Sequence, residues 1–274
     1  MSADPEIRWT LDPMILLALA AYAGIYAWRF RGARREAGGR GAGLARAAAF
    51  AAAMLALAAA LISPIAALGE EHLFSMHMLQ HVLLGDIAPV LLLLSLSRVI
   101  MRPATRRLVA IERRLGRLAH PAVFLAGWLG LVYVWHIPAL YDAATQTPAL
   151  HALEHASFFA AGVLFWWPLV QPVPMRHRMT GLQPFVYIGA GKALLAGLGV
   201  FLTWSNTVVY SHYETVPRIW GLSALDDQNV GGAIMMAEQS IVLAIAFATL
   251  FVLMIGRSEE EERRRERLEE AAAT

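Results

Sequence analysis

The stretch LFSMHMLQHVLLGDIAPVLLLLSL, residues 73–96, decides the fold. It is apolar almost throughout, carries one charged residue, Asp86, and is long enough to cross the roughly 30 Å hydrocarbon core of a bilayer as a helix. The whole chain of 274 residues is 58% hydrophobic and 16% charged, with a mean hydropathy of +0.51. Soluble domains are about 45–50% apolar and about 25% charged. The composition therefore predicts a polytopic membrane protein and excludes a soluble enzyme, a disordered chain and a nucleic-acid-binding protein.

Further apolar runs of this kind predict an all-α membrane protein, a bundle of seven transmembrane helices. The expected spans are residues 13–28, 47–68, 73–96, 121–137, 150–170, 185–204 and 230–255. Glycine- and alanine-rich stretches favour close helix packing in lipid and allow a homo-oligomer. We expect residues 1–256 to form the transmembrane domain and residues 257–274 a charged tail. In the tail, glutamates and arginines about one turn apart favour a short solvated helix.

Arginine is unevenly distributed between alternate loops, which predicts the orientation of the chain. It gathers in residues 29–46, 98–117 and 176–178 and at the start of the tail, whereas the alternate loops hold only Arg8 and Arg218. Because cytoplasmic loops are enriched in Lys and Arg, we expect the N-terminus outside and the C-terminus in the cytoplasm. The net charge of +2 thus reflects topology, and no nucleic-acid partner is expected.

Nine histidines are present and cysteine is absent, so any metal site must use His, Met, Asp or Glu. His77 and His81 open the third span and His151 and His155 open the fifth, at the spacing i, i+4 that places two side chains on one helix face. His136 ends the fourth span at the same expected depth, near the outer surface. Each histidine alone would serve as an interfacial polar residue. Together they predict a metal or haem site, because polar side chains at membrane depth usually face the bundle interior.

Several neighbouring residues are candidates for additional ligands or for orienting the imidazoles: Met76, Met78, Glu154, Met235 and His72. Imidazole suits copper, zinc, iron or nickel, and thioether sulfur favours Cu(I). The methionines therefore favour copper, as Cu(I), with zinc or haem b as alternatives, although methionine in a membrane helix commonly serves packing. Glu70 and Glu71 would be either interfacial charges or carboxylates that hold an imidazole by its second nitrogen.

Three ionisable residues are expected deep in the membrane: Asp86, Lys192 and Glu238, in the third, sixth and seventh spans. Lys192 is the only lysine, since every other cationic side chain is arginine. Ionisable groups in mid-membrane are costly and usually have a partner, so we expect Lys192 to pair with Asp86 or Glu238. Such a pair would be either structural or part of a proton or ion relay.

Four motifs, in order, resemble those of the CtaG family of cytochrome c oxidase assembly factors, bacterial membrane proteins associated with caa(3)-type oxidases. They are MHMLQHVLL at residues 76–84, WHIPALYD at 135–142, HALEH at 151–155 with FWWP at 165–168, and DQxxGGxxM at 227–235. The resemblance covers roughly residues 70–255. The chain departs from the family where the third span ends, because the sequence SLSR stands in place of a Gly-x-Pro-like turn.

The resemblance implies a non-enzymatic integral protein of the bacterial inner membrane that assists the assembly of a haem-copper cytochrome c oxidase. It implies that copper is bound by the histidines on the outer side and presented to the oxidase. The implied partners are oxidase subunits, a periplasmic copper chaperone and membrane lipid.

Three other functions fit parts of the sequence. A haem-binding membrane redox protein would use imidazoles from facing helices, for example His81 and His155, as axial ligands. A metal- or proton-coupled transporter would use the intramembrane charges, although no inverted repeat is detectable. A zinc hydrolase would need water activated beside a carboxylate such as Glu154, and the H-E-x-x-H signature is absent.

Overall fold

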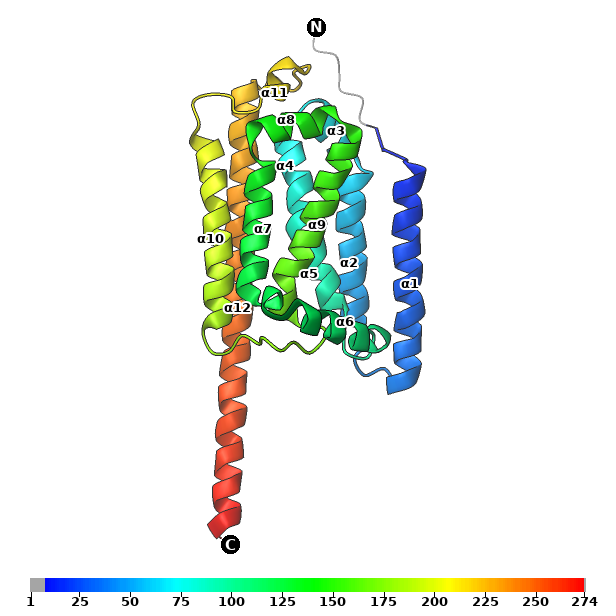
Figure 1. Ribbon diagram of the computed structural model, residues 1–274, viewed down its shortest axis with the longest axis vertical. Helices are drawn as coiled ribbons and strands as arrows, with labels where there is room; N and C mark the ends of the chain where they lie inside the picture. Colours follow the sequence, from blue (N-terminus) through cyan, green and yellow to red (C-terminus); the bar gives the residue numbers. More distant parts are fainter. Residues whose placement is uncertain (1–7, 274) are drawn as a thin grey trace.

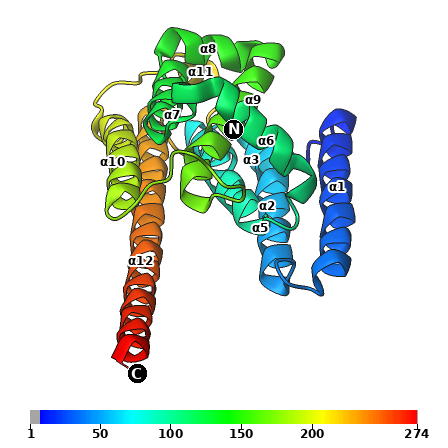
Figure 2. The ribbon, with the colours of Figure 1, turned by 60° about the horizontal axis from the view of Figure 1, so that its bottom comes forward.

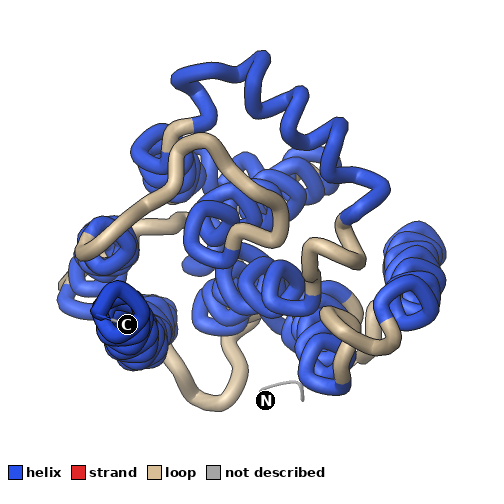
Figure 3. The backbone as a smooth tube through the Cα atoms, turned by 90° about the horizontal axis from the view of Figure 1, so that it is seen from below, coloured by secondary structure: helices blue, strands red, loops and turns tan. Residues whose placement is uncertain are grey.

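The computed structural model describes residues 8–273, which form helices and loops without a strand (Figure 1; Figure 3). Most helices run side by side in one bundle (Figure 1). The helices are α1 Pro13–Ala37, α2 Leu44–Leu61, α3 Pro64–Glu71, α4 Phe74–Val82, α5 Ala88–Ser95, α6 Arg102–Leu115, α7 Pro121–Trp135, α8 Pro138–Gln146, α9 Pro148–Val170, α10 Gln183–Trp204, α11 His212–Thr215 and α12 Ala224–Ala273. A π-helical turn, η1 Leu83–Ile87, joins α4 to α5, and a 3-10 turn, η2 Gly116–Ala119, precedes α7.

Six helical stretches among the described residues are long and apolar enough to cross a membrane, or seven if one bent pair counts as a span. The six are Pro13–Ala37, Leu44–Glu71, Phe74–Ser95, Pro148–Val170, Gln183–Trp204 and Ala224–Ala271. The bent pair consists of Arg102–Ala119 and Pro121–Trp135, which meet at 75°. The prediction of an all-helical multi-pass protein is confirmed. The predicted fourth span corresponds to α7, which has only 15 residues and counts as a span only together with the helix before it.

The two ends of the bundle differ. At one end lie α3, α8 and α11, and across the opposite end lies α6, which buries none of its side chains (Figure 1; Figure 2). Beyond α6, α12 continues as a single exposed helix through the charged tail, where Arg263 Nη2 and Glu259 Oε2 are 2.9 Å apart. The tail is helical as expected, but it prolongs the seventh span instead of forming a separate short helix. Thr274 lies outside the described residues.

The second predicted span is broken near the end that carries α3. Ser63 separates α2 from α3, and its hydroxyl accepts a hydrogen bond of 3.2 Å from the Ile65 N–H, which caps α3. After this break, α3 packs backbone to backbone on α4, since a Cβ added at Gly69 would lie 2.8 Å from the His77 nitrogen. The break therefore brings α3 directly over the start of α4.

The third span widens at η1. Pro89 has no N–H to donate, and its ring would clash with the carbonyl four residues earlier in a regular α-helix. The chain responds with a π turn, in which the Ala88 N–H bonds to the Leu83 carbonyl, five residues back. At this turn α9 comes into backbone contact, because a Cβ at Gly162 would overlap the Gly85 carbonyl oxygen. Glycine is therefore required where α9 crosses η1.

Glycine also sets the spacing between α10 and α12. A Cβ added at Gly199 would lie 2.9 Å from the Gly232 carbonyl oxygen, and one at Gly232 would lie 2.5 Å from the Thr203 nitrogen. In contrast, α1 stands at the edge of the bundle, where Tyr26 stacks on Phe50 of α2 with ring centroids 3.7 Å apart (Figure 1). The core thus lies between α4–α5, α7, α9, α10 and α12.

Candidate metal centre

The start of α4 is held in place by an acid from α12. The Asp227 carboxylate accepts hydrogen bonds from the N–H groups of Phe74, at 2.8 Å, and Ser75, at 3.0 Å. A carboxylate at a helix N-terminus satisfies donors without intrahelical partners and interacts favourably with the helix dipole. Arg218 forms an ion pair of 3.6 Å with the same carboxylate. This arrangement fixes the depth and rotation of α4, and with them the positions of its two histidines.

Four donor groups gather beside this fixed helix. His77 of α4 and His151, Glu154 and His155 of α9 each offer one ligand atom, and these atoms all lie within 4.8 Å of one another. We call this group the His–Glu cluster. The Nε2 atoms of His77 and His151 are 3.4 Å apart. Two nitrogens that each lie about 2.0–2.1 Å from one tetrahedral ion are about 3.3–3.4 Å apart, so the spacing fits a shared ion.

Two tyrosine hydroxyls orient His77 by hydrogen bonding to its Nδ1. Tyr213 donates its hydroxyl to the Gly69 carbonyl at 2.8 Å, so it accepts the hydrogen bond that joins it to His77 Nδ1 at 2.9 Å. The Tyr141 hydroxyl lies 2.8 Å from the same nitrogen. Burial raises the pKa of the Tyr141 and Tyr213 phenols, which keeps both hydroxyls protonated. The proton of His77 therefore sits on Nδ1, and the Nε2 lone pair faces the cluster.

Glu154 is fully buried within the cluster. Neither of its carboxylate oxygens has a hydrogen-bond partner among the described residues, and Glu154 Oε1 lies 3.7 Å from His81 Nε2. An ionised carboxylate without a partner in a buried site carries a penalty of several kcal/mol. The cluster therefore has the donors and the charge of a site that receives a cation, and the residues fit a metal ion.

The cluster reaches the surface at one edge. The His151 side chain is 13% exposed, and its Nδ1 lies 3.8 Å from Glu70 Oε1, whose side chain is 47% exposed. The Glu70 carboxylate therefore faces Nδ1 of His151, and holding an imidazole by its second nitrogen is one of the two roles that the sequence suggests for Glu70. The adjacent Glu71 instead pairs with Arg8. An ion would therefore reach the cluster past Glu70 and His151.

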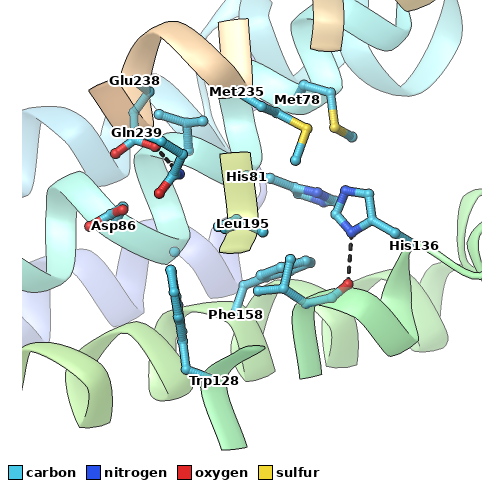
Figure 4. A pocket seen from close by; sticks show the side chains of 13 residues that line it. Met78, His81, Asp86, Trp128, His136, Phe158, Leu195, Met235, Glu238 and Gln239 are labelled. Atoms are coloured by element: carbon cyan, nitrogen blue, oxygen red, sulfur yellow. Dashed lines mark hydrogen bonds between the residues drawn. The ribbon is translucent and has the colours of Figure 1, made fainter. Parts of the chain in front are cut away.

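Inward from the cluster lies a cavity of about 40 Å³ (Figure 4). His81 and His136 line it together with Met78 and Met235. His136 Nδ1 donates to the Val132 carbonyl at 2.8 Å, which leaves Nε2 without a hydrogen-bond partner in the described structure, and neither nitrogen of His81 has one. The structure thus divides the five predicted histidines, with three in the His–Glu cluster and two in the cavity below it.

The intramembrane charges meet at the far end of this cavity. Asp86 and Glu238 both line it, and Lys192 forms ion pairs with both, at 3.4 Å between Nζ and Glu238 Oε1. Lys192 therefore pairs with each of the two candidate acids. Its Nζ also lies 5.4 Å from the ring of Trp166, whose Nε1 donates to Asp86 Oδ1 at 2.5 Å. We call Asp86, Lys192 and Glu238 the charge triad.

Two of the candidate residues lie elsewhere. Met76 packs against an apolar group formed by Leu68, Leu73 and Ile219. His72 Nδ1 contacts the Pro217 carbonyl oxygen at 3.2 Å. Neither belongs to the His–Glu cluster or lines the cavity. Met76 faces away because it is one residue from His77, and neighbouring residues on a helix point about 100° apart.

The hydrogen-bonding partners of the site were not predicted from the sequence. Tyr213 lies in the one-turn helix α11, within the segment between α10 and α12, which has no long periodic pattern. Asp142 anchors this loop by accepting hydrogen bonds from the Ser211 hydroxyl, at 2.6 Å, and the His212 N–H, at 3.3 Å. Tyr141 and Asp142 stand in the WHIPALYD motif, whose polar residues were the one available signal.

The fold and the site together define a multi-pass helical membrane protein with a buried histidine–glutamate cluster near one end of its bundle. The chain belongs to the family of cytochrome c oxidase caa3 assembly factors, Caa3_CtaG, which matches residues 24–257. The family predicted from the motifs is confirmed. Membership supports a role in oxidase assembly.

Three mycobacterial proteins are similar to the chain, each described as uncharacterised. The protein of Mycobacterium leprae is 24% identical over 199 residues, which are 65% of this chain and 29% of that protein. The proteins of Mycobacterium bovis and Mycobacterium tuberculosis are each 26% identical over 255 residues, which are 86% of this chain and 38% of those proteins. The chain therefore spans about a third of the length of these relatives. No solved structure matches the chain significantly.

Proposed function

We propose that the protein binds Cu(I) in the His–Glu cluster and presents it to a haem-copper cytochrome c oxidase during assembly of the oxidase. Family membership supports the assembly role. The observation that carries the metal role is the buried Glu154 carboxylate, which has no hydrogen-bond partner among the described residues and is surrounded by imidazoles. In this proposal the ion is cargo, and the protein itself is non-catalytic.

The charge of the cluster suits a monovalent cation. Neutral imidazoles contribute no charge, and the ionised Glu154 contributes one negative charge, so bound Cu(I) makes the buried site neutral. Imidazole is a good ligand for copper, and it also binds zinc. Copper is the ion that a haem-copper oxidase needs from an assembly factor, so the family supports copper over zinc.

The position of the cluster suits delivery. The Arg distribution predicts that this end of the bundle faces outward, where an oxidase subunit or a periplasmic copper chaperone would meet it in a bacterial inner membrane. A cargo site must release its ion, and the partly exposed His151 provides an edge at which a partner's ligands can replace those of the cluster.

The geometry favours a metal ion over haem. The cavity beside the cluster has a volume of about 40 Å³, whereas pockets for ligands of drug size are about 300–1,000 Å³. The Nε2 atoms of His77 and His151 face each other at 3.4 Å, which leaves no room for a porphyrin plane between them. The site therefore supports a bare ion better than a b-type haem.

Complementation of a deletion strain tests the proposal. Wild-type protein and the control variant His177→Ala, at the opposite end of the bundle, are expected to restore the activity and the copper content of the oxidase. Glu154→Gln and His155→Ala are expected to lower the copper content at least about tenfold, the effect typical of losing a group that supports a metal site.

The level of each variant in the membrane, measured by immunoblot, separates loss of function from loss of protein. Normal oxidase copper with Glu154→Gln and His155→Ala would overturn the delivery role. Copper uptake into liposomes that contain the purified protein would replace it with a transport role.

A further inference from the structure

A second set of soft donor atoms lies one helical turn inward from the His–Glu cluster. Met78 and His81 project from α4, His136 caps the end of α7, and Met235 comes from α12. All four line the same cavity of about 40 Å³ (Figure 4). Met78 is fully buried, and the other three are 5–6% exposed. Three segments distant in sequence thus place two thioethers and two imidazoles around one small space.

The imidazoles in this cavity have nitrogens without protein partners. His136 uses Nδ1 for the Val132 carbonyl, so its Nε2 is free to accept a ligand, and His81 has no hydrogen bond at either nitrogen within the described residues. Their ring centroids are 6.3 Å apart. When two imidazoles bind one ion, each centroid lies about 3.2 Å from it, so the centroids are about 5 Å apart in tetrahedral and about 6.4 Å in linear coordination. The observed separation lies within the range that one shared ion allows.

The methionines decide which ion suits the cavity. Thioether sulfur is a soft, neutral ligand that selects Cu(I) over Zn²⁺, Mg²⁺ or Ca²⁺. Figure 4 shows the side chains of Met78 and Met235 on the same side of the two imidazole rings. Both residues are at most 5% exposed, so they are not part of a surface that a partner could contact. Packing alone would explain buried methionine but would not explain the imidazoles beside it with unused nitrogens.

The charge triad supplies the negative charge that a buried Cu(I) site with neutral ligands requires. Four neutral ligands leave the full positive charge of Cu(I) in place, and a buried charge without a counterion is costly. With both carboxylates ionised, Asp86 and Glu238 carry two negative charges against the single positive charge of Lys192. The excess of one negative charge lines the same cavity as the four donors.

We infer that Met78, His81, His136 and Met235 form a second Cu(I) site, inward from the His–Glu cluster and balanced by the charge triad. His81 joins the two sites, because its Nε2 lies 3.7 Å from Glu154 Oε1 and its ring also lines the inner cavity. A copper ion taken up at the cluster can therefore move to the soft site by exchanging ligands at His81. This inference takes the identity of the ion from the proposed function, whereas the four donor residues follow independently from the lining of the inner cavity.

Titration of the purified full-length protein in detergent tests this assignment. Anaerobic Cu(I), in competition with a chromophoric Cu(I) chelator, is expected to load about two equivalents into the wild type. Met78→Leu/Met235→Leu is expected to load about one, and it conserves volume and apolarity so that the fold is retained. The matched control is Met236→Leu, whose side chain packs toward Gly199 and does not line the cavity. It is expected to load two.

X-ray absorption at the copper edge gives a readout that needs no variant. The wild type loaded with two equivalents is expected to show sulfur in the coordination shell, since cysteine is absent and methionine is the only source of sulfur in the chain. Zn²⁺, used as a probe that binds imidazole well and thioether weakly, is expected to load one equivalent with nitrogen and oxygen ligands alone. A copper spectrum without sulfur, or a double variant that still binds two equivalents, would overturn the second site.

The same experiment separates this inference from the proposed function. In His151→Ala/His155→Ala the second site is expected to persist, with about one equivalent of copper and an undiminished sulfur signal. One equivalent bound by nitrogen and oxygen in the wild type would overturn the second site and leave the His–Glu cluster in place. One equivalent with sulfur in the wild type, unaffected by His151→Ala/His155→Ala, would support the second site and remove the cluster.

Discussion

Replacing Lys192 with methionine would leave Asp86 and Glu238 without their cation. All three side chains are at least nine-tenths buried, and the aromatic rings of Trp128 and Phe165 complete the surroundings of the ammonium group, 5.5 and 5.7 Å from Nζ. Methionine has a similar length and volume but no charge. Lys192→Met therefore removes the charge and changes the packing little.

The expected loss of stability follows from the burial of the charge triad. Removing one member of a buried ion pair costs about 3–5 kcal/mol, because the remaining charge is left without compensation. A change of 1 kcal/mol shifts Tm by about 2–4 °C for domains of 150–250 residues, so we expect Tm to fall by roughly 6–20 °C. Most of this cost belongs to the carboxylates, so neutralising them should restore stability. We expect Lys192→Met/Asp86→Asn/Glu238→Gln to recover at least half of the loss.

Thermal unfolding in detergent, followed by circular dichroism, measures these shifts. The matched control is Arg263→Met, which breaks the exposed pair with Glu259 and should change the stability by less than about 0.5 kcal/mol. A Tm for Lys192→Met within 2 °C of the wild type would refute the reasoning. So would a triple variant as unstable as the single one, because the loss would then come from packing and not from unpaired charge.

Three further predictions follow from individual contacts. Gly162→Ala is expected to destabilise the protein by about 1–3 kcal/mol, because the added Cβ would overlap the Gly85 carbonyl oxygen. The control Gly24→Ala, at a position with open space around it, should be neutral or slightly stabilising. Equal Tm values for the two variants would contradict the close crossing of α9 and η1. Asp227→Ala is expected to lower the free energy of unfolding by about 2–3 kcal/mol, because the hydrogen bonds to the start of α4 are lost. The control Asp226→Ala, at the adjacent residue, which bonds only to Ser223, is expected to lower it less. Thermal unfolding measures both effects, and the reverse order would contradict the role of Asp227. Tyr213→Phe is expected to weaken Cu(I) binding about 10–100-fold, because it removes one of the two hydroxyls that orient His77 Nδ1. In the control Tyr133→Phe, which removes a hydrogen bond to the Leu194 carbonyl away from the site, the affinity in chelator competition should not change. Equal affinities for the two variants would show that Tyr213 does not orient the ligand.

Much of the bundle follows from hydrophobic runs, because a long apolar helix has few alternatives in a membrane. The points at which the helices end or break do not follow from hydrophobic runs. The break at Ser63 and the π turn before Pro89 depend on how α3 and α9 pack on the third span, and a single-sequence pattern does not contain those contacts. The length of α12 was missed because the charged tail has no helix-stopping residue, although its composition differs from that of the span.

The candidate site could be proposed from the sequence because its histidines occur in pairs at helical spacing. The spacing placed His151 and His155 on one face and, through the cost of polar groups in lipid, turned that face inward. It did not show that His81 would border both the cluster and the cavity, since this depends on the rotation of α4 that Asp227 fixes. Tyr213 lies in α11, which has only four residues, and a helix this short shows no periodicity that would indicate the direction of a side chain.

The most direct test of the account compares the metal-free and Cu(I)-loaded forms of Glu154→Gln. If the carboxylate is present to receive a cation, its removal relieves an unpaired buried charge, so the metal-free variant should have a Tm equal to or above that of the metal-free wild type. Cu(I) should then stabilise the variant much less than it stabilises the wild type. A metal-free variant with a clearly lower Tm, together with undiminished stabilisation by Cu(I), would contradict the role assigned to Glu154.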